Sequence, residues 1–97
     1  MMQSDRIVAK REVVSRSVGD EVVLLDLSSG TYFGLDPIGS RFWQLADSGK
    51  SLSEICDALI EEYEVRREQL EGDILVLVSE LVAANLASVV SPERDGV

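Results

Sequence analysis

Histidine is absent from this chain of 97 residues, and cysteine occurs once, as Cys56. Histidine is the commonest general base, a common metal ligand and the usual activator of serine and cysteine nucleophiles. Its absence excludes most hydrolase arrangements and argues against a metal site. A single cysteine cannot form an internal disulfide, which favours a cytoplasmic location over an oxidising compartment. We therefore expect no catalysis, no metal and no other cofactor.

Phosphate-binding motifs are also missing. The chain contains neither G-x-G-x-x-G nor a P-loop, and Gly30, Gly34 and Gly39 suit turns and helix caps instead. Cys56 lies on the apolar side of a predicted helix without a basic neighbour in sequence, which favours a structural thiol over a reactive one. The acidic run at residues 61–64 is typical of a solvated helix face.

Positive charge is scarce, because 9 basic residues face 18 acidic ones and the net charge is −9. Such a field repels phosphate backbones and anionic lipid surfaces, so neither nucleic acid nor a membrane is an expected partner. The first ten residues carry charges where a signal peptide needs an apolar core, and no run approaches the ~18 apolar residues of a membrane span.

Apolar residues, in contrast, are plentiful at 45%, which is enough for one folded domain. Residues 1–11 have no sustained periodicity and are predicted to form a mobile arm. Residues 12–90 are predicted to form the domain, and residues 91–97 a polar tail.

The first half of the domain is predicted to be β structure. Residues 12–18 suit a short strand, and residues 21–27 and 31–35 suit a hairpin. A turn at Ser29 and Gly30 predicts that Leu27 lies opposite Tyr32. Both faces of this hairpin are apolar enough to be covered: one carries Leu24, Phe33 and Leu35, and the other Leu25, Leu27 and Tyr32.

Three helices are predicted to follow. Asp36 and Pro37 suit a helix start, and the first helix should end at Ser48 and Gly49. The capping box from Ser51 to Glu54 predicts a second helix that runs to about residue 64. A third is predicted over residues 67–87, with a brief final strand at residues 89–90.

The third helix has an unusually wide apolar surface. Residues placed 100° apart form one arc with Leu70, Ile74 and Leu81, but Leu75 and Val82 widen it to roughly half the circumference. Two interpretations are open. The helix is the central helix of a small domain, or part of its surface lines a groove.

The strand at residues 31–35 is the best functional candidate. A small sheet has edges, and this strand has neither charge nor proline to protect it. Gly34 allows another backbone to approach closely. In β-strand addition, main-chain bonds supply part of the affinity and side-chain pockets confer selectivity. The pattern predicts a peptide-binding domain.

These residues also resemble a known family. The resemblance is carried by LLDLSSGTYFGLDPIG at residues 24–39, Phe42 and Trp43, SLSEI at residues 51–55 and GDILVLVSEL at residues 72–81. In this order they are similar to the PqqD-like family, the recognition elements of ribosomally made, modified peptides. The chain departs from the family's pattern at Arg66 and at residues 85–87, which puts the ends of the third helix in question.

The resemblance implies an α+β, winged-helix-like fold, with a three-stranded antiparallel sheet followed by three helices. It implies that the leader segment of a precursor peptide binds as an added strand and is presented to a peptidase, cyclase or radical enzyme. The run at residues 36–39 is closer to members of lasso-peptide pathways than to the member acting in PQQ synthesis. The implied peptide-binding residues are Thr31, Tyr32, Phe33, Gly34, Leu35, Asp73, Leu77, Glu80, Leu81 and Ala84.

Two alternatives share this architecture. Winged-helix folds occur in DNA-binding regulators, although the net charge of −9 argues against that role. The open strand could instead pair with its own copy, making the protein a structural homodimer. The sequence does not separate a monomer from a homodimer, because both peptide capture and self-pairing use unpaired backbone.

Overall fold

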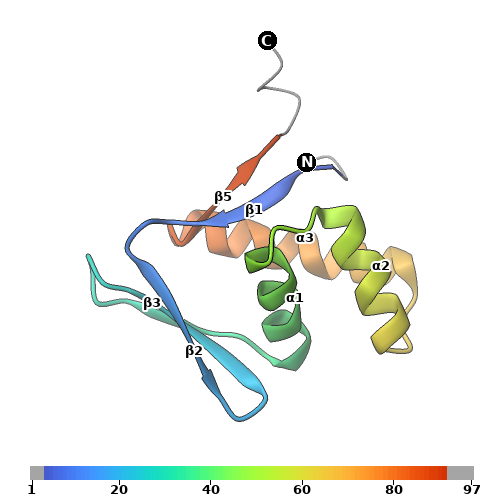
Figure 1. The fold of residues 1–97 in the computed structure, drawn as a ribbon, viewed down its shortest axis with the longest axis horizontal. Coiled ribbons are helices and arrows are strands. Elements are labelled where there is room, and N and C mark those ends of the chain that lie inside the picture. Colours follow the sequence, from blue (N-terminus) through green and yellow to red (C-terminus); the bar gives the residue numbers. More distant parts are fainter. Residues whose placement is uncertain (1–3, 92–97) are drawn as a thin grey trace.

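The computed structural model describes residues 4–91 and confirms the predicted α+β, winged-helix-like fold (Figure 1). Antiparallel strands come first, three helices follow, and a final strand ends the domain. In chain order the elements are β1 (Arg6–Ala9), β2 (Val13–Val18), β3 (Glu21–Asp26), β4 (Tyr32–Gly34), α1 (Pro37–Asp47), α2 (Leu52–Glu62), α3 (Arg67–Ala83) and β5 (Ala87–Val90).

The mobile arm predicted for residues 1–11 is wrong at residues 6–9, which form β1. This strand pairs antiparallel with β5, with Ile7 opposite Val89, and the two lie side by side in Figure 1. Ile7 is buried, so β1 is held by the core as well as by backbone hydrogen bonds. Because the partner strand lies some 80 residues further along the chain, no local pattern could predict the pairing. The predicted strand at residues 89–90 is confirmed and begins earlier, at Ala87.

The hairpin exists, but its predicted register is wrong by two residues. Leu25, and not Leu27, lies opposite Tyr32, and Leu24 lies opposite Phe33. Because side chains alternate along a strand, a shift of two residues leaves each side chain on its predicted face. Leu24 is therefore still on the inner face with Phe33.

A longer turn accounts for the shift. The Asp26 carboxylate accepts hydrogen bonds from the Ser28 N–H (3.0 Å), the Ser28 hydroxyl (2.7 Å) and the Ser29 hydroxyl (3.0 Å). Gly30 closes the turn at φ +76°, a left-handed conformation that favours glycine. The hydrogen bonds from Ser28, and then those from Ser29, hold the pKa of Asp26 below its ordinary value.

The outer face of the hairpin is open, contrary to the prediction that both faces are covered. Tyr32 is 74% exposed and Leu27 61%. The helices pack on the inner face, where Leu24 and Leu35 are buried. Residues 4–91 therefore cover one side of this sheet only.

The first two helices begin as predicted. The Asp36 carboxylate accepts a hydrogen bond from the Gly39 N–H at 2.7 Å and so caps α1. In α2, Ser51 and Glu54 form both hydrogen bonds of the capping box, at 3.3 and 2.8 Å. Both caps were readable from local sequence because all of their partners lie within three residues.

The third helix ends four residues earlier than predicted, at Ala83. Asn85 adopts the left-handed conformation at φ 61°, which asparagine tolerates better than most residues. Leu86 is then fully buried, and the chain continues into β5. At the other end, Arg66 precedes the helix without a side-chain cap.

One buried hydroxyl ties α1 to the end of the β3–β4 ladder. Ser40 is 1% exposed. Its Oγ accepts a hydrogen bond from the Val22 N–H at 2.7 Å and donates one to the Leu35 carbonyl at 3.2 Å. The Leu35 N–H donates to the Val22 carbonyl at 2.9 Å, so Ser40 completes the pairing of these two residues. This bridge fixes the point where β4 enters α1.

Replacing Ser40 with alanine is therefore expected to lower the free energy of unfolding by about 1–3 kcal/mol, because it leaves the buried Val22 N–H without an acceptor. Urea unfolding followed by the fluorescence of Trp43 measures the effect. The exposed helix variant Ser79→Ala is the matched control and should change stability by less than about 0.5 kcal/mol. Equal midpoints for the two variants would contradict the bridging role.

Candidate functional site

The outer edge of β4 carries unpaired backbone. The strand order is β2-β3-β4, so β4 pairs on one side only among the described residues. The Thr31 carbonyl and the Leu35 N–H both bond to β3. Because backbone groups alternate in direction along a strand, Tyr32 and Gly34 turn their N–H and carbonyl groups toward the open edge.

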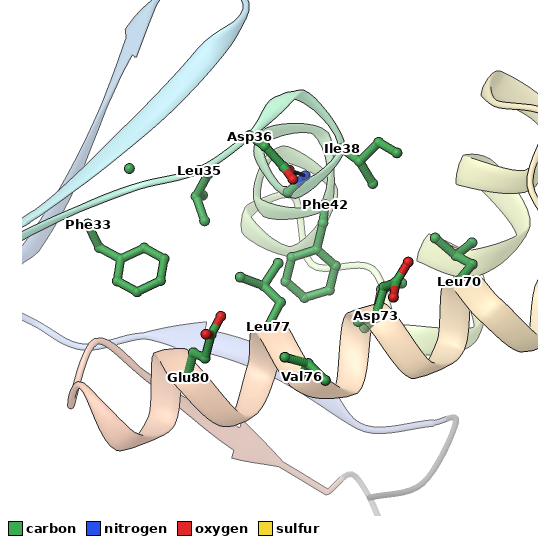
Figure 2. A pocket seen from close by; sticks show the side chains of 13 residues that line it. Phe33, Leu35, Asp36, Ile38, Phe42, Leu70, Asp73, Val76, Leu77 and Glu80 are labelled. Carbon is green, nitrogen blue, oxygen red and sulfur yellow. Dashed lines mark hydrogen bonds between the residues drawn. The ribbon is translucent and has the colours of Figure 1, made fainter.

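A groove of about 390 Å³ lies beside this edge, between β4, the start of α1 and one face of α3. Figure 2 shows Asp73 and Glu80 toward its two ends, with Val76 and Leu77 between them. The lining is mostly apolar and consists of Phe33, Gly34, Leu35, Asp36, Ile38, Gly39, Phe42, Leu70, Asp73, Ile74, Val76, Leu77 and Glu80.

The structure brings together one part of the predicted peptide-binding set. The predicted residues that line the groove are Phe33, Gly34, Leu35, Asp73, Leu77 and Glu80. Tyr32 is the first residue of β4 and Thr31 directly precedes it, and neither lines the groove. Leu81 is fully buried in the core, and Ala84 lies just beyond the last turn of α3. These last two residues therefore lie apart from the groove.

Sequence reasoning missed the wall that α1 contributes, which includes Ile38, Gly39 and Phe42. A signal was present. Because Asp36 starts a helix directly after the edge strand, the first turn of that helix must border the edge. The sequence pattern predicts a helix start at Asp36, but the prediction does not include the position of the first turn of this helix beside the edge strand.

Gly39 allows α1 and α3 to approach closely at the floor of the groove. A Cβ atom at this position would lie 3.0 Å from the Asp36 Oδ1 and 3.5 Å from the Leu77 Cδ2. Leu77 is half-buried and lines the groove, whereas Leu75 is 47% exposed and does not. Of these two leucines, Leu77 is the one positioned to contact a bound chain.

Among the described residues, the charged side chains that line the groove are all acidic, namely Asp36, Asp73 and Glu80. Two arginines of the helices are engaged elsewhere. Arg41 pairs with Glu62 at 2.9 Å and holds the pKa of that carboxyl below its usual range. Arg67 forms ion pairs with Asp57 and Glu71.

Other kinds of site find no support in the described residues. No group of three metal-ligating side chains occurs within residues 4–91. Cys56 is buried, and burial raises the pKa of its thiol, which lowers its reactivity. Among the helices described, none has the length and apolar character needed to span a membrane.

Comparisons with known proteins agree with the resemblance noted in the sequence. Residues 21–87 match the family described as "Coenzyme PQQ synthesis protein D (PqqD)". A solved structure described as "TbiB1 in Complex with the TbiA(beta) Leader Peptide" is 44% identical, with a TM-score of 0.80 over 84% of this chain and 94% of that chain. Another, "Lasso peptide synthetase B1 complexed with the leader peptide", is 30% identical, with a TM-score of 0.76 over 88% and 98%. No curated protein matches significantly.

Proposed function

The chain belongs to the PqqD family, and on that basis we propose that it binds the leader segment of a ribosomally made precursor peptide. It is a recognition element rather than an enzyme. The leader adds to β4 as a further strand and lies in the groove between β4 and α3. The observation that carries this binding mode is the open backbone of Tyr32 and Gly34 beside an apolar groove.

Backbone pairing supplies only part of the affinity. Tyr32 and Gly34 each offer one donor and one acceptor to an incoming strand, and a typical hydrogen bond adds only about 0.5–1.5 kcal/mol net. β4 spans only Tyr32–Gly34, so its ladder is short. The remaining affinity comes from side chains of the leader that point inward and bury apolar area against Phe33, Ile38 and Leu77.

Capture of the leader holds the precursor near the enzyme that modifies it. One of the two solved relatives is a lasso peptide synthetase component bound to a leader peptide. We therefore place this domain in a pathway of that kind, where it presents the leader to a peptidase, cyclase or radical enzyme. The single, buried cysteine is in keeping with work in the cytoplasm.

Titration of the TbiA(beta) leader peptide into isotope-labelled protein tests the function by NMR. The expected result is a set of shifted resonances on β4, the first turn of α1 and the stretch from Asp73 to Glu80. A response confined to the exposed surface of α2, or no response at all, would sink the proposal. Duplex DNA added at the same concentration is the control for a regulator and should leave the spectrum unchanged.

The oligomeric state is tested on the same samples. Self-pairing through β4 would use the edge that the leader needs, so a homodimer should dissociate as the leader is added. A monomer should stay monomeric at every leader concentration. Light scattering distinguishes these results. A dimer that binds the leader without dissociating would place the dimer contact elsewhere on the protein.

A further inference from the structure

Two of the carboxylates of α3, Asp73 and Glu80, lie on either side of the apolar centre of the groove. Asp73 and Glu80 are seven residues apart, which corresponds to two helical turns and about 10.5 Å along the axis. They therefore lie on the same face of the helix. Val76 and Leu77 lie between them, as Figure 2 shows. The wall presents one negative charge, an apolar surface and a second negative charge.

The described residues do not neutralise either carboxylate. Within residues 4–91, no ion pair or hydrogen bond involves the side chain of Asp73 or Glu80. Asp36 differs, because its carboxylate caps α1 through the Gly39 N–H. Asp73 and Glu80 are thus available to pair with a cationic ligand. Because the chain has 9 basic residues and 18 acidic ones, its own cations are too few to neutralise all of its carboxylates.

The spacing of an added strand matches this wall. Residues two apart in a strand point to the same side and are separated by about 6.7 Å. If the added strand runs along the axis of α3 with an apolar residue over Leu77, the inward-facing residues on either side of it lie within about 2 Å of the axial levels of Asp73 and Glu80. Lysine and arginine side chains are long enough to cover that difference.

We propose that the groove selects leader segments of the pattern cation-x-apolar-x-cation, in which the apolar side chain contacts Leu77 and the cations pair with Asp73 and Glu80. This inference rests on the proposed leader binding and adds the chemistry that the leader must carry. Both carboxylates are solvent-exposed, so each pair contributes modestly, about twofold to fivefold in affinity. The combined contribution of the two ion pairs to the affinity should decrease as the salt concentration rises.

A displayed library of random nine-residue peptides tests the proposal. It is selected against the wild-type protein, the neutral variant Asp73→Asn/Glu80→Gln, the reversed variant Asp73→Lys/Glu80→Lys and the edge variant Gly34→Pro. The variant Glu61→Gln/Glu64→Gln is the control, since it removes the same charge from an exposed region away from the groove. Asp36 is left unchanged because its cap supports α1.

The expected result is enrichment of lysine and arginine two positions either side of an apolar anchor, with the wild type and the control. The neutral variant should lose that enrichment, and the reversed variant should select acidic residues there. Binders that depend on Gly34 but show no charge preference at these positions would overturn the inference and leave leader binding intact. A library without any binder that depends on Gly34 would overturn both.

Discussion

Replacing Gly34 with proline is expected to weaken leader binding by about tenfold to a hundredfold while the domain stays folded. Proline removes the outward N–H of the edge strand, and its ring occupies space that an incoming backbone needs. Leaving the leader's acceptor unpaired in the complex costs about 1–3 kcal/mol. The Gly34 N–H does not bond to β3, so the β3–β4 ladder keeps its hydrogen bonds. Calorimetric titration of the TbiA(beta) leader measures the loss.

The other edge of the same sheet provides a matched control. Ser15 of β2 also turns its N–H away from β3, because the neighbouring Val14 and Arg16 make the hydrogen bonds to that strand. Ser15→Pro therefore removes an outward donor from an edge that we do not assign to the leader. It should bind the leader as the wild type does. Equal affinities for Gly34→Pro and Ser15→Pro, with both variants folded, would refute strand addition at β4.

Replacing Leu77 with alanine is expected to lower the affinity for the leader by about fivefold to thirtyfold, which is the second large effect. Leu77 lines the groove and is only half-buried in the free protein, so part of its side chain is open to a bound chain. Alanine removes apolar area worth about 1–2 kcal/mol in the complex, at roughly 0.8 kcal/mol per buried CH₂ group. The affinity is measured by fluorescence anisotropy of a labelled leader.

Leu75 gives the comparison on the same helix. It is 47% exposed and outside the groove, so Leu75→Ala should change the affinity by less than about twofold. Thermal unfolding of both variants shows whether the binding loss reflects stability, since Leu77 also packs against the core. If Leu75→Ala weakens binding as much as Leu77→Ala does, the leader lies on a different face of α3.

The parts of the fold that sequence predicted correctly depend on short-range chemistry. The caps at Asp36 and Ser51 need partners within three residues, so their donors and acceptors are visible in the sequence. The inner face of the hairpin was predicted despite the wrong register, because alternation survives a shift of two. The unprotected strand edge at Gly34 could also be predicted, because a run of residues without charge or proline is a local feature of the sequence.

The missing parts depend on contacts between distant residues or on competing local conformations. β1 depends on its pairing with the distant β5 and on the burial of Ile7 in the core, and Ile7 alone gives no periodic signal in the sequence. The predicted end of α3 is wrong because the prediction includes Asn85 in the helix, whereas the left-handed conformation of Asn85 starts the turn into β5. The sequence contains the acidic residues of α3, but only the structure shows that Asp73 and Glu80 line the same groove.

Hydrogen exchange of the β4 amides tests strand addition most directly. In the free protein the Tyr32 and Gly34 amides face solvent and should exchange rapidly, whereas the Leu35 amide is already bonded to the Val22 carbonyl. Saturation with the TbiA(beta) leader should slow exchange at Tyr32 and Gly34 by at least about tenfold and alter Leu35 far less. Unchanged exchange at both edge amides in the saturated complex would contradict strand addition.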